Sequence, residues 1–317
     1  MKISVVTPYY NNFDQVSRCV DSVLLQDYDD FEVILVDDGS TDTGHGFAPN
    51  DSRIVSIRNP INLGPAAARN LAVARAGGDL IVFLDSDSVV DDPQWLRRHA
   101  EAHRLAGDGV IIGGGIEGFG RGVVAKADAY CHWFTNIPRR EAWQGQGTRF
   151  EFIDRSKLVT NNMSFRRDTF DRIGPLDKAL RTGEDGDFCA RAVALGIPIK
   201  LVPSIVVRHE DRDSLRDFYR CFYKVGLDRI PLYYKHRFRF WRILPRNRLE
   251  WVAFVLVVPW LLALQTTIAW LPYERRVLAY FPLISISYFA MAHGIFVYLA
   301  GSTAGEPSAG SLGPSRS

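Results

Sequence analysis

The sequence predicts an α/β protein, with a mainly parallel sheet flanked by helices and a C-terminal transmembrane helical hairpin. Short β-branched runs alternate with helical patterns over the first ninety residues, which is typical of a parallel sheet covered on both faces. Near the C-terminus, two stretches with no acidic or basic residue apart from one histidine are each long enough to cross a bilayer. The 317 residues are 47% hydrophobic, which supplies an ample core for a large domain and an extension.

In the first ninety residues the sequence predicts four strands with helices between them. The strands are expected at 3–7, 32–36, 54–57 and 80–84, where β-branched runs are bounded by polar residues. In the first gap, apolar residues recur at helical spacing from Val16 to Leu24. In the third gap, Pro65 stands at a first helical position and Gly77 just past the end.

Further helices and strands follow up to residue 210, where the first domain is expected to end. Helices are predicted at 92–105, 167–173 and 185–195, and strands at 110–116, 197–202 and 205–209. Gly113, Gly114 and Gly115 leave room for a close backbone approach at the sugar or the acceptor. Residues 121–155 lack periodicity and are predicted to form a mobile loop over an active site.

The last third of the chain is predicted to associate with a membrane. Residues 211–250 form a basic and aromatic juxtamembrane segment, with an amphipathic pattern at 213–225 that suits the membrane interface. Helices at about 251–271 and 277–300 are predicted to span the bilayer, and 301–317 to be a disordered tail. A re-entrant hairpin is the alternative, because Pro259 and Pro282 interrupt these stretches.

The distribution of basic residues predicts the orientation and the partner. Basic residues crowd just before the first apolar stretch, whereas the connecting turn has only Arg275 and Arg276, so the first domain is expected in the cytoplasm. The adjoining apolar stretches make a bilayer, and not nucleic acid, the expected partner of this charge.

Four short polar motifs follow predicted strands or open a helix. They are Val36-Asp37-Asp38-Gly39-Ser40, Leu84-Asp85-Ser86-Asp87, Thr160-Asn161-Asn162-Met163-Ser164 and Gly183-Glu184-Asp185-Gly186-Asp187. Carboxylates at the carboxyl edge of an α/β sheet lie where such folds bind ligands, and Asp-x-Asp can hold the divalent cation that a diphosphate requires. The motifs predict a nucleotide-sugar site, although each by itself also makes a good turn or helix cap.

Together with two further motifs, these resemble family 2 glycosyltransferases of the GT-A fold, in the same order along residues 1–210. The further motifs are Thr7-Pro8-Tyr9-Tyr10-Asn11, and Asn62-Leu63-Gly64 followed by Ala68-Arg69-Asn70. The resemblance implies an inverting transferase that needs Mg²⁺ or Mn²⁺. It also implies the residues that bind the nucleotide-sugar donor: Thr7, Pro8, Tyr9 and Asp38 at the nucleoside, Asp85 at the ribose, and Asn161 and Asn162 beneath the sugar.

The resemblance also implies metal ligands, and the residues suggest a base. Asp87 matches the metal ligand of the family, and His209 a histidine that some relatives place near the metal or the diphosphate. Asp185 is expected to be the general base and Glu184 to position the acceptor or the loop. Arg69 either adds positive charge at the donor or is a solvated helix residue. For the acidic run at 184–187 the alternative is helix capping alone.

The sequence thus predicts a transferase that moves a sugar to a lipid-linked or envelope glycan acceptor. Single-sugar transfer is expected, because the Gln-x-x-Arg-Trp run of processive synthases is absent from the sequence. The alternative is a catalytically inactive module at the membrane that binds nucleotide-sugars or serves as a scaffold.

Overall fold

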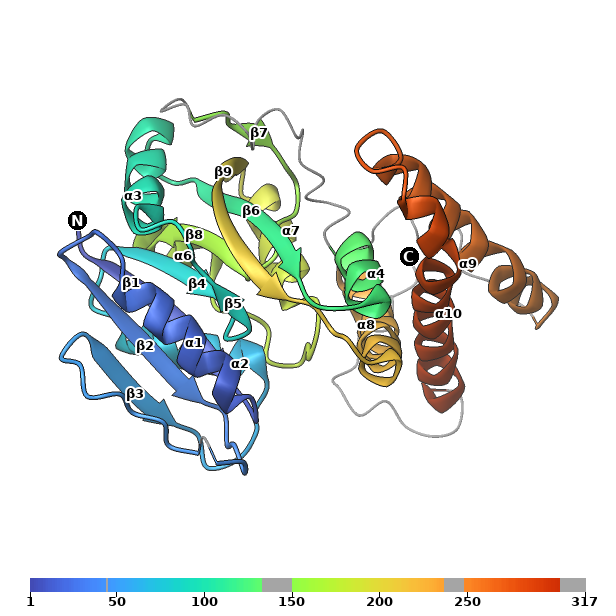
Figure 1. Ribbon diagram of the computed structural model, residues 1–317, viewed down its shortest axis with the longest axis horizontal. Coiled ribbons are helices and arrows are strands. Elements are labelled where there is room, and N and C mark those ends of the chain that lie inside the picture. The colour runs from blue at the N-terminus through green and yellow to red at the C-terminus, as the bar shows by residue number, and fades with distance from the viewer. Residues whose placement is uncertain (44, 133–149, 237–247, 303–317) are drawn as a thin grey trace, which may run out of the picture.

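The computed structural model describes residues 1–43, 45–132, 150–236 and 248–302. An α/β domain occupies one side of the molecule, and the C-terminal helices stand beside it as a separate layer (Figure 1). Helix α4 (Val123–His132) and helix α8 (Leu215–His236) lie between the two parts.

The first half of the sheet is parallel, as predicted. Strands β1 (Ile3–Tyr9), β2 (Phe31–Asp37), β3 (Ile54–Arg58) and β4 (Leu80–Leu84) lie in the order β3-β2-β1-β4. Alternate residues of a strand face opposite ways. Val5 therefore packs in the cluster that includes helix α1 (Phe13–Leu24), while Val6 packs in the cluster that includes helix α2 (Pro65–Arg75). No helix fills the second gap: its described residues form turns and bends, which corrects the expected alternation.

The second half makes the sheet mixed, so the prediction of a mainly parallel sheet is wrong for this half. Strand β8 (Asn162–Arg166) runs antiparallel to both β4 and β6 (Ile111–Phe119). The reason is that Asn162 pairs with Leu84, the last residue of β4, so β8 starts at the edge where β4 ends and runs back along it. Strand β9 (Ile199–Glu210) is parallel to β6 and also pairs with the short strands β5 (Ser88–Val89) and β7 (Ile153–Asp154).

Three predicted elements differ in extent. The two strands expected at 197–202 and 205–209 are the single strand β9, whose irregularity is taken up by a register shift at Gly114 and Gly115 of β6. The expected loop at 121–155 contains α4 and β7, and its residues 133–149 lie outside the described residues. The remaining helices are α3 (Trp95–Ala106), α6 (Arg167–Ile173) and α7 (Glu184–Ala194), close to the predicted ranges.

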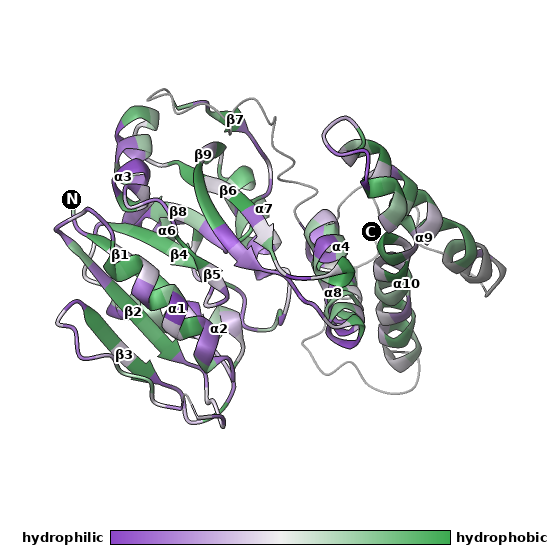
Figure 2. Cartoon of the chain, in the orientation of Figure 1, coloured by the Kyte–Doolittle hydropathy of each residue, from purple (hydrophilic) through white to green (hydrophobic). Residues whose placement is uncertain are grey.

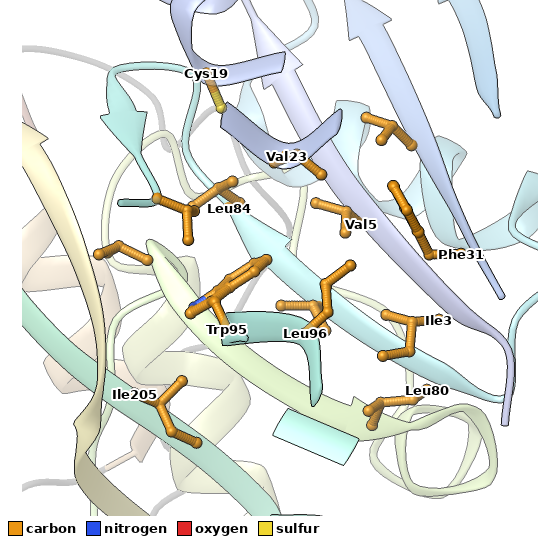
Figure 3. Close-up of a cluster of buried hydrophobic side chains, with 14 of the residues drawn as sticks. Ile3, Val5, Cys19, Val23, Phe31, Leu80, Leu84, Trp95, Leu96 and Ile205 are labelled. Carbon is orange, nitrogen blue, oxygen red and sulfur yellow. The ribbon is translucent and has the colours of Figure 1, made fainter. Parts of the chain in front are cut away.

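The core on one face of the sheet joins the two halves. Figure 3 shows Trp95 and Leu96 of α3 among Ile3, Leu80, Leu84 and Ile205, which come from β1, β4 and β9. Trp95 is fully buried, and its Nε1 donates to Asn162 Oδ1 over 3.2 Å. Burial of side chains this large contributes about 1.5–3 kcal/mol each. This packing fixes the strand ends on which the polar motifs lie.

The C-terminal helices are α8, α9 (Arg248–Trp270) and α10 (Val277–Ser302). Both α9 and α10 are largely hydrophobic (Figure 2). In the described part of the chain, one stretch, Val277–Gly301, is long and apolar enough to span a membrane, whereas Leu256–Trp270 is shorter. One candidate span is therefore supported, and the hairpin stays a prediction. Of the predicted tail, residues 303–317 lie outside the described residues, as do residues 237–247 of the basic segment.

Helices α8 and α10 cross at two glycines. A Cβ atom on Gly226 would lie 2.1 Å from the carbonyl oxygen of Met291, and one on Gly294 would lie 2.1 Å from that of Tyr223. Nearby, Tyr219 Oη and His293 Nδ1 are 2.8 Å apart. Small residues let helix backbones approach closely, so this pair of glycines sets the distance between α10 and the rest of the protein.

Gly226→Ala is expected to destabilise the protein by about 1–3 kcal/mol, because the added methyl group forces two packed backbones apart. Chemical denaturation of the detergent-solubilised protein measures the change. Gly301→Ala is the matched control: it also lies in a helix, nothing stands within 4 Å of its Cβ position, and it should be neutral or stabilising. An equal response of both variants would show that the crossing does not depend on close backbone contact.

Candidate active site

A cavity of about 760 Å³ opens at the carboxyl edge of β1, β2 and β4. Its walls come from the loops after these strands, the start of α2, the loop before α7, and α8. The predicted residues that line it are Pro8, Tyr9, Asp38, Arg69, Asp85 and Asp87. The fold therefore gathers at one opening the strand ends that the sequence singled out, which is where α/β sheets bind ligands.

Asp38 is held in place by backbone donors. Its carboxylate accepts hydrogen bonds from Gly64 N (2.8 Å), Leu63 N (3.1 Å) and Asn59 Nδ2 (2.7 Å). The loop after β2 can approach the chain at Ile61 because residue 39 is a glycine. Gly39 has a φ of +79°, and a Cβ atom added there would lie 2.5 Å from the backbone of Ile61. Asp38 thus ties the loop after β2 to the start of α2 at the wall of the cavity.

Asp37 and Tyr9 flank this wall. Asp37 accepts from Ser40 N (2.7 Å), Gly46 N (2.9 Å) and Arg58 Nη1 (2.5 Å), so it organises the turn after β2. Burial and the charge of Asp37 raise the pKa of Tyr9 to about 12, so its hydroxyl stays neutral. Tyr9 borders the cavity but is only 3% exposed, because it packs in the buried cluster that includes α1.

Arg69 joins the two acidic motifs. It is buried, which excludes the solvated alternative, and donates from Nη2 to Asp85 Oδ1 (2.5 Å) and from Nη1 to Glu184 Oε1 (2.8 Å). Burial raises the pKa of Asp85, partly offset by Arg69. Burial also raises the pKa of Glu184, to about 7, against the opposing effect of Arg69. A single guanidinium therefore links the end of β4 to the start of α7.

Asp87 and His209 lie together at the far side of the same edge. His209 Nε2 is 3.3 Å from Asp87 Oδ2, and His209 Nδ1 is 3.4 Å from Asp211 Oδ1. Burial would lower the pKa of His209, but the Asp87 carboxylate raises it to about 10. Burial would raise the pKa of Asp87, but His209 lowers it to about 2. Asp87 Oδ1 is buried with no hydrogen-bond partner among the described residues.

Three predicted donor residues do not line this cavity. Asn162 has all its hydrogen bonds filled inside the core, since its amide donates to Gly115 O and Ile205 O and its oxygen accepts from Trp95 and His99. The expected contact with the donor is therefore wrong for Asn162. The glycine run of β6 makes room for this amide: a Cβ on Gly114 would lie 2.1 Å from Asn162 Nδ2. Thr7 and Asn161 are likewise buried and do not line the cavity.

Asp185 faces a second, smaller cavity of about 260 Å³. It is the second residue of α7, directly after Glu184, and its Oδ1 accepts from the backbone of Gly186 (2.6 Å). Lys157 Nζ lies 3.9 Å from the same oxygen. Thr182 and Asp228 line both cavities, so Asp185 lies across a thin wall from the first one.

Several lining residues were not predicted as site residues. Lys224, Leu227 and Asp228 of α8 and Arg181 before α7 line the first cavity. The basic and aromatic pattern of α8 suggested a membrane surface, but α8 also lines this cavity, beyond the predicted end of the first domain at residue 210. Asn12 was missed as well: its amide donates to Ser86 Oγ (2.8 Å) between the loops after β1 and β4.

Comparisons with known proteins agree with this geometry. The model of "Glycosyl transferase family 2" matches residues 4–174. Glycosyltransferase AglE of Haloferax volcanii is 25% identical over 248 residues, 76% of this chain and 77% of that protein. A pre-mycofactocin glycosyltransferase of Mycobacterium tuberculosis is 29% identical over 74% of this chain, which spans 48% of that relative's length.

Solved structures share the fold. TarS 1–349 of S. aureus, in complex with UDP-GlcNAc, aligns over 95% of this chain and 92% of its own with a TM-score of 0.55 and 19% identity. The mannosyltransferase PcManGT of Pyrobaculum calidifontis, in complex with GDP-Man and Mn²⁺, aligns over 96% and 87% with a TM-score of 0.57 and 17% identity. The match over residues 4–174 shows that the chain belongs to glycosyl transferase family 2, and the solved structures show that its α/β domain has a GT-A-like fold.

Proposed function

We propose that the protein is an inverting, metal-dependent glycosyltransferase that moves a sugar from a nucleotide-diphosphate donor to a hydroxyl of a lipid-linked or glycan acceptor. The observation that carries the proposal is the link Asp85–Arg69–Glu184, which holds the wall of the larger cavity next to Asp185. Neighbouring structures hold UDP-GlcNAc or GDP-Man, which supports this donor class.

The larger cavity is the donor site in this proposal. Tyr9 and Asp38 border the nucleoside, and Asp38 has a second lone pair on Oδ2 available beyond its bond from Gly64. Asp85 keeps one oxygen for the ribose while the other accepts from Arg69. Lys224 and Arg181 supply positive charge from the opposite wall, where a diphosphate is attracted.

A divalent cation fits at Asp87. No group of three or more His, Cys, Asp and Glu side chains within the described ranges could hold an ion alone, so donor oxygens would complete the coordination shell. The buried, unpartnered Oδ1 of Asp87 is a suitable oxygen ligand, and His209 stands beside it. Mg²⁺ or Mn²⁺ bound there supplies charge stabilisation for the departing diphosphate.

Asp185 is the base of the proposed reaction. Its carboxylate takes the proton of the acceptor hydroxyl while that oxygen bonds to the anomeric carbon of the sugar. The bond from that carbon to the diphosphate breaks, the nucleoside diphosphate leaves, and the configuration inverts. Glu184, tied to Arg69, is a positioning residue that fixes the start of α7. Acceptor entry from the smaller cavity then places the nucleophile opposite the leaving group.

The proposed location is a membrane, with the α/β domain on the cytoplasmic side and both α9 and α10 crossing. The length and hydropathy of α10 support a membrane contact. Several apolar side chains on the surfaces of α9 and α10 support it too, among them Leu256, Trp260, Leu261, Leu278 and Phe296. Apolar patches of this kind mark membrane or protein contacts.

Release of free nucleotide from a panel of UDP-, GDP- and dTDP-sugars tests the function. The detergent-purified protein is incubated with Mn²⁺ or Mg²⁺ and a total lipid extract. Lipid-stimulated release from one donor, abolished by chelation, is the expected result and names the donor. Metal-dependent donor binding without release under any condition would instead favour the inactive binding module.

A further inference from the structure

We propose that the smaller cavity is the acceptor site and that it takes the reacting end of an amphiphilic acceptor, a sugar joined through phosphate to an isoprenoid chain. This inference rests on the proposed function and deepens it. The cavity lies where α4, α7, α8 and α10 meet, and Asp185 is part of its lining. At about 260 Å³ it has room for only the end of such a molecule.

One wall of this cavity is apolar and leads to the candidate membrane span. Phe222 and Leu232 come from α8, and Tyr288 and Met291 from α10. The close α8–α10 crossing at Gly226 brings Met291 to this position. In this proposal the acceptor chain lies along α10, whose residues Tyr288 and Met291 line the cavity. A water-soluble glycan would leave this wall without a complementary partner.

Charged residues line the same cavity beside the apolar ones, and the ring of His132 lies 4.7 Å from that of Phe222. Lys157 lies 3.9 Å from Asp185, and Arg229 and His132 line the same space. His132 Nδ1 is 2.9 Å from Asp128 Oδ1, and this carboxylate raises the pKa of His132 to about 9 against the effect of burial. Cationic groups beside an apolar wall are the chemistry that recognises a lipid phosphate.

The wall shared with the donor cavity is thin. Thr182 Oγ1 donates to Asp228 Oδ2 over 2.8 Å, and both residues line both cavities. Because the acceptor oxygen must bond directly to the anomeric carbon, the proposed reaction requires this Thr182–Asp228 contact to open. In the proposed complex, the lipid end of the acceptor lies against α8 and α10, and its reacting hydroxyl lies beside the start of α7.

Two variants test the assignment by binding, without the need for turnover. Met291→Trp fills the apolar wall, and Val297→Trp places the same side chain on the exposed face of α10 as the control. The dissociation constant of a short-chain polyisoprenyl phosphate in detergent micelles is expected to rise at least about tenfold in Met291→Trp only. Nucleotide-sugar affinity, measured on the same sample, should be unchanged and shows that the variant is folded.

Lys157→Gln tests whether positive charge in the smaller cavity binds the phosphate of the acceptor. It is expected to weaken binding of the polyisoprenyl phosphate but not of the matching polyisoprenol, which lacks the phosphate. Unchanged lipid binding in both Met291→Trp and Lys157→Gln, or tighter binding of a water-soluble glycan, would overturn the acceptor site while leaving nucleotide release as a separate test of the function. If nucleotide-sugars do not bind at all, it is the proposed function that fails.

Discussion

Asp185→Asn is expected to lower the rate of sugar transfer by about 10²–10⁴-fold, which is the usual contribution of a general base. The amide has nearly the shape of the carboxylate but cannot take the acceptor proton. Asp185 is not part of the donor cavity lining, so affinity for the nucleotide-sugar should change by less than about threefold. Transfer is measured by product formation, and donor affinity by calorimetry on the same preparation.

Asp154→Asn is the matched control, because Asp154 is an exposed aspartate whose carboxylate pairs with Lys200 and which lines neither cavity. It should transfer at the wild-type rate. A substantially active Asp185→Asn enzyme would remove Asp185 from the mechanism. Loss of both transfer and donor binding would point to a structural role at the start of α7, the capping alternative.

Arg69→Met is expected to destabilise the protein by about 3–5 kcal/mol, because it removes the cation between two buried or partly buried carboxylates. The side chains of Arg69 and Glu184 are 5% and 8% exposed, so little water can reach Glu184 to replace the lost hydrogen bond. Donor affinity should fall as well, since Asp85 loses the contact that orients it in the cavity. The free energy of unfolding and donor affinity are measured together.

The decrease in the free energy of unfolding caused by Arg69→Met should depend on pH. Glu184 has a pKa raised to about 7 from an ordinary 4.5, so its ionisation costs folding free energy as pH rises through this window. Without Arg69 that cost grows, and the gap between wild type and variant should be larger at pH 8 than at pH 5. Arg69→Lys is the control: it keeps a charge but cannot bond both carboxylates at once, so its effect should be intermediate. A pH-independent gap would mean that packing against Phe83, and not charge, explains the loss.

These variants separate two parts of one site that meet at α8. The α/β domain supplies the carboxylates, and α8 supplies part of the wall of both cavities while it packs on α10. A change in the position of α10 can thus reach the larger cavity through a single helix. This coupling is the reason to test donor affinity in every variant of the helical layer.

The pattern of apolar residues was enough to predict the parallel half of the sheet and the position of the polar motifs at its strand ends. Runs such as Leu80–Leu84 are apolar on both faces, which only a covered strand tolerates, and the acidic motif that follows must then lie at the strand end. Strand ends of one parallel sheet meet at one edge, so the neighbourhood of Asp38 and Asp85 followed from local pattern alone. Pro65 and Gly77, at the two ends of a helical stretch, predicted α2.

The direction of β8, the burial of the Asn162 side chain in the core and the position of α8 depend on contacts between residues far apart in the chain. Strand direction depends on which edge the chain returns from, and a strand pattern reads the same in both directions. A shift of one residue turns a side chain to the other face, so adjacent Asn161 and Asn162 could not be assigned from their identity. The amphipathic pattern of α8 records that one face is buried but not against what, because the burial partner lies far away along the chain.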